Sequence, residues 1–403
     1  MRSAPLDITI AGAGIGGLTT ALALARNGIT SKIFEQRSDA IEAGAGIQLG
    51  PNATGVLSRL GLLDDVLAVS AEPDALSIHD GISGRVLARF PLGRWMRDRY
   101  GAPYLTLHRQ DLHRALLSAA VRDARIEIAS GRTVASFQDG AAHVDARMAD
   151  GQLVSASALI AADGLWSQLR ACVAKGAFPQ PTEKCAYRAV VAATSLPSQL
   201  AANDVHIWLA PGAHVVHYPV RRGTETAIVV VIDDNAQSDA WDCVANVDRL
   251  AKSAVARLAP QLSELILSHD DWRMWRLQTL VPLRQWVRGR AALLGDAAHP
   301  VLPFFAQGGG LAIEDAEVLG HCLAGSGTVE ARLRFYEISR RRRAQRVAAA
   351  SVSNGRVYHM AGAGAMARNA VLATVPGTWL MRRYDWLYGW TPDQAFSSTI
   401  ASV

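Results

Sequence analysis

The 403-residue chain has few of the features that mark secreted, metal-binding or membrane proteins. It holds only four cysteines, and their wide spacing fits neither a disulfide framework nor a zinc site. It has no apolar run long enough to span a membrane, no internal repeat and no low-complexity linker. The first strand pattern begins too early to leave room for a cleaved signal peptide. We therefore expect a metal-free protein of the reducing cytoplasm.

Charge of neither sign dominates the chain. The 41 basic and 36 acidic residues leave a net charge of +5, which suits acidic small molecules but gives no argument for nucleic acid. The densest basic run, residues 340–343 with Arg346, lies in a helical tail, where we expect a solvated helix face with some ion pairs. Half of the residues are hydrophobic, and the length predicts two to three domains' worth of chain with a large core.

The stretch from residue 6 to residue 35 carries a complete nucleotide-binding pattern. An apolar strand at 6–11 is followed by a G-x-G-x-x-G turn, an apolar helix at 18–27, and a second strand at 31–34 that ends at Glu35. This order of strand, glycine turn, helix, strand and acid is the context that gives the glycine motif its specificity. It predicts a parallel βαβ unit that binds a dinucleotide.

Each residue type in this unit has a physical reason. Gly12 lets the chain turn sharply, Gly14 lets a pyrophosphate approach the backbone, and Gly17 allows the helix to pack closely on the strand. The helix N-terminus then offers free N–H groups and a partial positive charge to phosphates. Glu35, eighteen residues after Gly17, lies near the expected position of an acid that binds a ribose hydroxyl, which favours FAD or NAD.

Two later blocks repeat the pattern of a buried strand that leads to an acid. Strand 159–162 leads to Asp163, and strand 291–294 leads to Asp296. Acids at the carboxyl ends of parallel strands point into the crevice where open α/β sheets bind ligands. The glycines at 308–310 then open a helix whose N–H groups would face an anion or an electron-rich ring.

Between these blocks, residues 187–233 are rich in short β patterns separated by glycine turns, which predicts an antiparallel sheet in a second domain. In the strand predicted at 213–220, His214 and Tyr218 share one face, while His217 lies on the other. Only one of the two histidines can therefore face a pocket on that sheet.

Three blocks in this order resemble the single-component flavin-dependent aromatic hydroxylases: the glycine turn with Glu35, the Asp-Gly pair at 163–164, and GDAAHP at 295–300. Segments 207–220 and 385–390 resemble the branch of salicylate hydroxylase, 3-hydroxybenzoate 6-hydroxylase and 6-hydroxynicotinate 3-monooxygenase. The resemblance covers essentially the whole chain. It implies an α/β fold in which a glutathione-reductase-like Rossmann domain binds FAD, an antiparallel-sheet domain binds substrate, and C-terminal helices follow.

The resemblance also implies the chemistry and the partners. One non-covalently bound FAD is reduced by a transient NADH or NADPH and reacts with O2 to a C4a-hydroperoxide, which transfers OH to an aromatic ring. The implied substrate is a hydroxybenzoate- or hydroxynicotinate-like acid, and the protein acts as a monomer or homodimer without nucleic acid or stable membrane insertion. The implied domains take 1–75, 103–177 and 275–330 for FAD, 76–102 and 178–274 for substrate, and 331–403 for the C-terminal helices.

By resemblance, the FAD site extends beyond the glycine turn. Glu35 would bind the ribose, Asp296 the ribityl chain, and Asp163 both FAD and the transient nicotinamide cofactor. The N–H groups at the start of the glycine-rich helix would lie near the flavin's pyrimidine edge and stabilise negative charge on the reduced ring. The full predicted set is Gly12, Gly14, Ile15, Gly16, Gly17, Glu35, Gln36, Arg37, Gly46, Arg109, Asp163, Asp296, Pro303, Gly308, Gly309, Gly310 and Leu311.

On the substrate side, His214 is the candidate base, because a phenol is far more nucleophilic once it is deprotonated. The histidine and tyrosine pattern of the related nicotinate enzyme matches His214 and Tyr218, and His217 is the alternative base. Related enzymes often have a polar residue or histidine near residues 304–305, which leaves the exact substrate open. The other predicted substrate residues are Gln48 over the flavin or substrate, Arg188 near the flavin or at the surface, and Phe304 and Phe305 as an apolar wall.

Three other functions fit the same sequence features. A tailoring hydroxylase or epoxidase of another heteroaromatic or polyene substrate would share all of the flavin motifs. A flavin-binding regulator would keep the cofactor site without the chemistry. A plain NAD dehydrogenase would use the glycine turn alone, and a colourless purified protein that binds NAD tightly would identify it.

Overall fold

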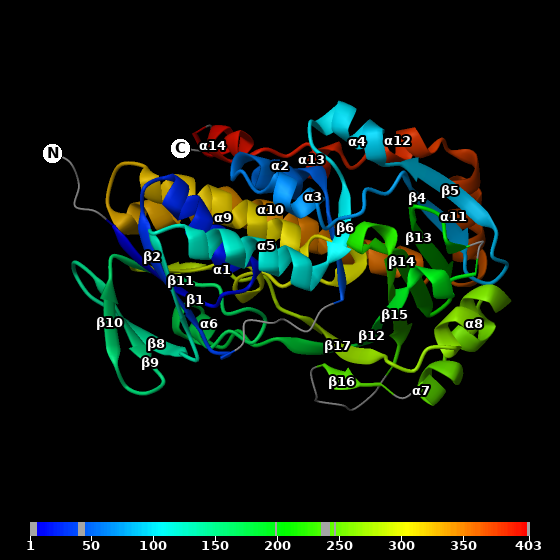
Figure 1. The fold of residues 1–403 in the computed structure, drawn as a ribbon, viewed down its shortest axis with the longest axis horizontal. Coiled ribbons are helices and arrows are strands. Elements are labelled where there is room, and N and C mark those ends of the chain that lie inside the picture. The colour runs from blue at the N-terminus through cyan, green and yellow to red at the C-terminus, as the bar shows by residue number, and fades with distance from the viewer. Residues whose placement is uncertain (1–5, 39–44, 198–199, 235–241, 246, 401–403) are drawn as a thin grey trace.

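The computed structural model describes residues 6–38, 45–197, 200–234, 242–245 and 247–400. Two large sheets lie toward opposite ends of the molecule, and the long helix α10 runs between them (Figure 1). This mixed α/β arrangement with C-terminal helices confirms the predicted fold class. The division into domains at the predicted boundaries stays a prediction.

The first sheet has six strands in the order β18-β19-β11-β1-β2-β7. Its neighbours pair in parallel except β18 with β19. Helix α1 (Ile15–Arg26) follows β1, and α5 (Arg109–Arg122) and α9 (Gly308–Ala324) pack against it, so the predicted βαβ unit is confirmed. The strands are β1 Asp7–Ala11, β2 Thr30–Glu35, β7 Ile126–Ser130, β11 Ala158–Ala161, β18 Val287–Arg288 and β19 Ala291–Leu293.

The second sheet has eight strands in the order β16-β17-β12-β15-β14-β13-β4-β5. Its neighbours are antiparallel except β13 with β4, where an early hairpin joins the sheet. The predicted antiparallel sheet is thus confirmed, with one parallel pair. Its strands are β4 Ala75–Asp80, β5 Val86–Pro91, β12 Gln180–Ala192, β13 Asp204–Ala210, β14 Ala213–Val220, β15 Glu225–Asp233, β16 Cys243–Val244 and β17 Arg273–Thr279.

The two faces of this second sheet bury different cores. The outer face packs side chains such as Val215 and Ile228 against helix α8 (Pro260–Leu267). The inner face carries Tyr218 and packs against strand β3 (Gly46–Leu49). Because successive side chains of a strand alternate between faces, the sequence position alone decides which of them reaches the inner face.

Smaller elements complete the chain. Strand β3 pairs with β6 (Leu105–His108), and β8 (Val134–Asp139), β9 (Val144–Met148) and β10 (Leu153–Ala156) form a three-stranded sheet. No helix in the described ranges is long and apolar enough to cross a membrane. The remaining helices are α2 Pro51–Arg59, α3 Leu63–Leu67, α4 Gly93–Tyr100, α6 Leu169–Val173, α7 Val247–Ala251, α10 Val329–Tyr358, α11 Gly362–Thr374, α12 Gly377–Arg382, α13 Asp385–Tyr388 and α14 Pro392–Ile400, with short 3-10 turns η1 Ala193–Ser195, η3 Arg221–Gly223, η4 Ala254–Arg257, η5 Gly295–Ala297 and η6 Pro303–Phe305.

The arginine run of α10 is only partly the solvated face that was expected, because Arg342 and Arg346 are exposed but Arg340 is not. Arg340 is fully buried and donates hydrogen bonds to Glu314 at 2.6 Å and Asp315 at 2.7 Å, both on α9. Arg343 donates to both carboxylate oxygens of Glu314, at 2.6 and 2.7 Å. The expectation of a solvated face was wrong for these two arginines, because their partner acids lie on another helix, where no local charge pattern shows the pairing. We call these four side chains the buried charge cluster.

Replacing Arg340 by methionine should lower the free energy of unfolding by about 3–5 kcal/mol, because each of two buried carboxylates loses one of its two cationic partners. Urea denaturation followed by tryptophan fluorescence measures the change. The exposed Arg342 on the same helix gives a matched control, and Arg342→Met should change the stability by less than about 0.5 kcal/mol. Equal stability of the two variants would contradict the role of the cluster.

Candidate active site

The glycine turn after β1 packs against the end of β11. Gly12 has φ of +101°, and a Cβ there would lie 2.5 Å from the carbonyl oxygen of Ala162. A Cβ on Gly17 would lie 1.9 Å from the carbonyl oxygen of Gly12. Glu35 reaches the same turn from the end of β2, and its Oε2 accepts a hydrogen bond from the backbone N–H of Ala13 at 2.8 Å. The fold therefore brings the turn and the acid together, as their spacing predicted.

The loop after β11 carries an acid with one carboxylate oxygen that has no hydrogen-bond partner among the described residues. Oδ2 of Asp163 accepts a hydrogen bond from the backbone N–H of Leu169 at 3.3 Å, whereas Oδ1 is enclosed and has no partner among the described residues. Burial raises the pKa of this carboxyl group. The buried Arg170 donates to the carbonyl oxygens of Ala297 at 2.7 Å and Asp296 at 2.8 Å, which links this loop to the turn after β19. No role was predicted for Arg170, because nothing in the local sequence shows that it is buried.

The turn after β19 is fixed to helix α9. The backbone N–H of Gly295 donates to Oδ2 of Asp315 at 3.2 Å, and Nε2 of His299 lies 2.5 Å from the same oxygen. Burial alone would raise the pKa of Asp315, but His299 and Arg340 together lower it to about 2. Asp315 thus stays a carboxylate that holds the turn, while the side chain of Asp296 is exposed on it.

The first turns of α1 and α9 come together beside β3. A Cβ on Gly16 would lie 3.4 Å from Ala312 of α9. A Cβ on Gly309 would lie 2.7 Å from Ile47 of β3 and 3.9 Å from Ile15 of α1. Neither helix has a side-chain hydrogen bond at its N-cap. Two uncapped helix starts place free N–H groups and partial positive charge side by side, which attracts an anion or an electron-rich ring edge.

Strand β3 connects this convergence to the inner face of the second sheet. A Cβ on Gly46 would lie 2.5 Å from Ala227 and 2.6 Å from the ring of Tyr218. The predicted cofactor residues and the predicted catalytic tyrosine are therefore neighbours. Of the other predicted cofactor residues, Gln36 and Arg37 follow β2 and are exposed, Arg109 begins α5, Pro303 begins η6, Gly14 is the N-cap of α1, and Gly308, Gly310 and Leu311 lie in the first turns of α9.

Three predicted substrate residues lie on the inner face. His214 and Tyr218 flank Val216 on β14, Val216 pairs with Val229 of β15, and Val229 pairs with Arg188 of β12. Arg188 is thus two strands, roughly 10 Å, from the strand that carries the other two. The two valines are only half-buried, whereas the outer face of the same sheet is covered by helix α8. They form an apolar floor framed by three polar side chains, which suits an aromatic ring with polar substituents.

Tyr218 and Gln48 belong to one hydrogen-bonded group. Tyr104 donates to Oε1 of Gln48 at 2.6 Å. Burial raises the pKa of Tyr218 to about 12, although Arg188 and a hydrogen bond with Gln48 favour the phenolate. Tyr218 is therefore a neutral hydroxyl at neutral pH, a hydrogen-bonding group rather than a base. Tyr104, which holds Gln48, was not predicted, since it lies in an apolar stretch without a motif.

Arg188 has no ion-pair partner among the described residues. Its Cζ lies 4.9 Å from the centroid of the Trp275 ring, and its Nε is enclosed and unpartnered in the described chain. Burial lowers the pKa of Arg188, Arg109 lowers it further, and Tyr218 and the charge of Asp242 raise it. A half-buried guanidinium whose enclosed N–H has no acceptor is unfavourable, so this position favours a ligand that brings a carboxylate.

His214 is held by residues from the far end of α10. Its Nδ1 lies 2.8 Å from Nε2 of His359, and its ring packs edge-on against Phe304 and Tyr358 at centroid distances of 5.4 and 5.2 Å. Burial, followed by His359 and Lys184, lowers the pKa of His214 well below 6.5. The imidazole is thus neutral at pH 7 and able to accept a proton. His359 was not predicted, because it lies 145 positions further along the chain.

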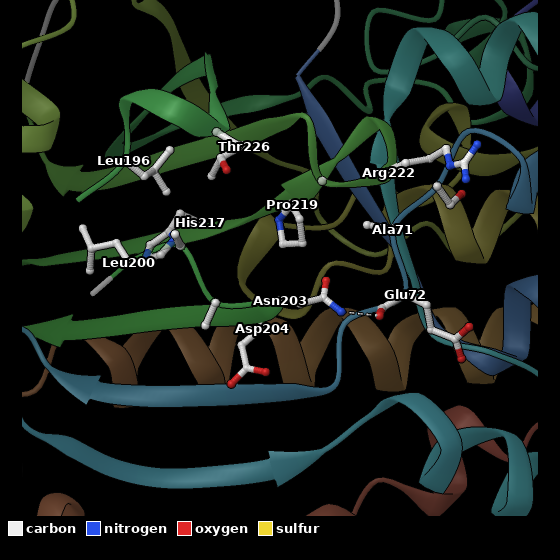
Figure 2. A pocket seen from close by; sticks show the side chains of 15 residues that line it. Ala71, Glu72, Leu196, Leu200, Asn203, Asp204, His217, Pro219, Arg222 and Thr226 are labelled. Atoms are coloured by element: carbon white, nitrogen blue, oxygen red, sulfur yellow. Dashed lines mark hydrogen bonds between the residues drawn. The ribbon is translucent and has the colours of Figure 1, made fainter. Parts of the chain in front are cut away.

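One predicted substrate residue, the alternative base, lies away from the inner face. His217 is on the outer face, stacks on His206 at 4.5 Å, and lines a cavity of about 430 Å³ that Thr226 also lines (Figure 2). Strand alternation is the reason, because His214 already takes the inner face. Phe305 packs against Tyr384 of the C-terminal region at 5.3 Å and belongs to the apolar cluster that also contains Val216 and Tyr218 of the inner face. His217 therefore does not share the face of His214, while Phe305 as part of an apolar wall stays a prediction.

The chain belongs to the FAD binding domain family, which matches residues 5–351. It is 35% identical over 391 residues to 3-hydroxybenzoate 6-hydroxylase of Polaromonas naphthalenivorans, covering 96% of each chain. It is also 35% identical over 354 residues to 6-hydroxynicotinate 3-monooxygenase of Bordetella bronchiseptica, covering 86% of this chain and 91% of the other. A solved salicylate hydroxylase substrate complex matches with a TM-score of 0.83 and 25% identity over 97% of each chain.

These comparisons confirm the predicted family and its cofactor. The chain is an FAD-dependent monooxygenase, from a family in which NAD(P)H and O2 are the typical co-substrates. The resemblance seen in three short blocks thus extends over nearly the whole length of both curated relatives.

Gly12→Ala should abolish FAD retention, because the new Cβ would strike the carbonyl oxygen of Ala162 and displace the turn. The ratio of visible flavin absorbance to protein absorbance after purification measures retention. Gly151→Ala is the matched control, since Gly151 also has positive φ, +88°, but its Cβ would meet nothing within 4 Å. Full flavin content in Gly12→Ala would count against this turn as part of the cofactor site.

Proposed function

We propose that this enzyme hydroxylates a small aromatic acid that carries a ring hydroxyl, of the hydroxybenzoate or hydroxynicotinate kind. The observation that carries the proposal is the enclosed, unpartnered Nε of Arg188 beside an apolar floor. A carboxylate on the ring would supply the missing anion. The printed names of two relatives, 3-hydroxybenzoate 6-hydroxylase and 6-hydroxynicotinate 3-monooxygenase, support the same class of substrate.

The residues at the carboxyl edge of the first sheet fit FAD. The two uncapped helix starts would receive its pyrophosphate and its pyrimidine edge, and Glu35 and Asp296 would bind its ribose and ribityl hydroxyls. The enclosed Oδ1 of Asp163 is an acceptor that a hydroxyl or N–H group of the cofactor would satisfy. When bound and reduced by NAD(P)H, FAD activates O2 for transfer to an electron-rich ring.

The protein's own side chains would orient the ring and raise its electron density. Arg188 would bind the carboxylate, and Tyr218 with Gln48 would hydrogen-bond a polar substituent. His214, neutral at pH 7, would take the proton of the ring hydroxyl at Nε2, since its Nδ1 already bonds to His359. The buried Phe304 beside His214 would help to exclude water from the ring.

The composition of the chain bears on its compartment and its partners. We propose that it acts in the cytoplasm as a monomer or homodimer, on a small molecule and without nucleic acid. Four widely spaced cysteines support a reducing compartment, and the modest net charge of +5 supports a small acidic substrate rather than a polyanion. Size-exclusion chromatography with light scattering determines which of the two oligomeric states is present.

Arg188→Gln should raise KM for 3-hydroxybenzoate by about 10- to 100-fold, because a charge-assisted hydrogen bond to the carboxylate is lost. KM for a phenol that lacks a carboxylate should change little. Substrate-dependent NADH oxidation measures both. Arg276→Gln is the control, because Arg276 lies on the neighbouring strand β17 and donates to the backbone of Thr182. Equal losses for the acid and the plain phenol would contradict the proposed carboxylate contact.

His214→Gln should lower hydroxylation at pH 7 by about 100-fold or more while FAD content is unchanged. The wild-type rate should be flat across neutral pH, because the lowered pKa of His214 keeps its base form populated there. The variant's rate should instead rise with pH toward the pKa of the phenol itself, near 10. Product formation by mass spectrometry across pH gives both profiles, and parallel profiles would remove His214 as the base.

A further inference from the structure

His214 begins a chain of hydrogen bonds that reaches the surface. Its Nδ1 lies 2.8 Å from Nε2 of His359, and Nδ1 of His359 lies 3.1 Å from Oδ1 of Asp233. His214 is 3% exposed and the His359 side chain 6%, whereas the Asp233 side chain is 53% exposed. Two imidazoles therefore connect the inner face of the second sheet to a carboxylate in contact with water.

Several backbone contacts fix His359 at this place. It is the C-cap of α10, and Arg368 of α11 donates to the carbonyl oxygens of Val357 at 2.8 Å and Tyr358 at 3.0 Å. The backbone N–H of Gly212, before β14, donates to the carbonyl oxygen of His359 at 3.5 Å. These contacts hold the imidazole between β14 and the end of β15 whichever nitrogen carries its proton.

His359 also has a partner for either tautomer. When Nδ1 carries the proton, it donates a hydrogen bond to Asp233. When Nδ1 has no proton, it accepts a hydrogen bond from Lys184 at 3.0 Å. Lys184 and Asp233 form an ion pair with each other as well. A ring whose two tautomers are both satisfied can exchange protons at opposite nitrogens without leaving an unpaired buried group.

We propose that His359 and Asp233 carry the proton of the substrate hydroxyl from His214 to solvent. The proposal rests on the proposed function, in which His214 is the base for a ring hydroxyl. His359 is the relay and Asp233 the exit, and both act through His214 rather than on the substrate.

The proton moves in four transfers that leave no charge on the imidazoles. The substrate O–H bond breaks as its proton binds Nε2 of His214, and the electron pair stays on the ring oxygen. The Nδ1 proton of His214 passes to Nε2 of His359, and the Nδ1 proton of His359 passes to Asp233 and then to water. When the product takes a proton back at the same oxygen, the transfers run in reverse and restore both tautomers.

The groups around the two rings keep them neutral between transfers. Burial and Lys184 lower the pKa of His359, with Asp233 opposing, and burial and His359 lower that of His214. Tyr358 packs on the His214 ring, and the cation of Arg368 lies at the end of α10. Neither of these two brings a carboxylate that would trap a proton on the path.

A second path from the inner face, through tyrosines, is interrupted by ring contacts that carry no hydrogen bond. Tyr104 donates to Gln48 at 2.6 Å and then meets Tyr388 by ring contact, with centroids 6.1 Å apart. Tyr104 and Tyr388 are 3% and 7% exposed, and burial raises the pKa of both. From Tyr388 the path continues only by a second ring contact, to Tyr100, which donates to the partly exposed Asp385. The histidine path is therefore the one in which a hydrogen bond makes every step from the inner face to an exposed carboxylate.

The test mixes oxidised holoenzyme with 3-hydroxybenzoate, without NAD(P)H, in weak buffer that contains a pH-indicator dye. Stopped-flow absorbance follows the change of the flavin spectrum on binding and the appearance of the substrate proton in solution. We expect the wild type to release about one proton as the ring binds. His359→Phe should slow this release by about tenfold or more with an unchanged flavin signal. Asp233→Asn, at the surface, should slow it as well, and added imidazole should restore the rate in His359→Gly.

His143, just before strand β9, and Asp145 on β9 form a pair 3.4 Å apart away from the second sheet and give matched controls. His143→Phe and Asp145→Asn should leave both signals unchanged. Wild-type release rates in His359→Phe and Asp233→Asn, with a normal flavin signal, would overturn the relay and leave His214 as the base. If neither 3-hydroxybenzoate nor 6-hydroxynicotinate perturbs the wild-type flavin, the proposed function fails and the relay with it. Binding without proton release would overturn both the relay and the base.

Discussion

The buried ion pairs between α9 and α10 are the interaction on which the rest of the structure depends. Glu314 and Asp315 lie side by side on α9 without exposure, and Arg340 and Arg343 of α10 neutralise them. Buried carboxylates are tolerated only with such partners, so the two helices have one way to pack. Asp315 also holds the backbone of Gly295, so the same cluster fixes the turn that carries the exposed acid at the carboxyl edge of the first sheet.

This cluster fixes the start of α9, near the cofactor residues, and the end of α10, near His214. Toward the start of α9, it places the uncapped first turn beside that of α1, where the residues fit FAD. His359, the C-cap of α10, lies nineteen residues after Arg340, which is roughly 28 Å along the helix. At this end of α10, His359 contacts His214. One helix pair therefore links the cofactor edge of the first sheet to the proposed base on the second. The C-terminal region thus contacts the proposed base directly rather than only covering the sheet.

Local spacing was enough to predict most of the fold and the contact of Glu35 with the glycine turn. The distance from Gly17 to Glu35 and the period of two in β14 are set by backbone geometry, so the sequence shows them directly. Contacts between distant segments were not predictable in this way. The burial of Arg340 and the contact of His359 with His214 each depend on how whole helices pack, and no neighbouring residue signals them.

The central claim is that the inner face binds a ring acid with its carboxylate on Arg188 and its hydroxyl on His214. A crystal structure of the holoenzyme with FAD and 3-hydroxybenzoate measures this most directly. The account predicts the carboxylate within hydrogen-bond distance of Arg188 and the ring oxygen within the same distance of Nε2 of His214. A ligand bound with its carboxylate against His214, or one seated in the outer-face cavity beside His217, would contradict it.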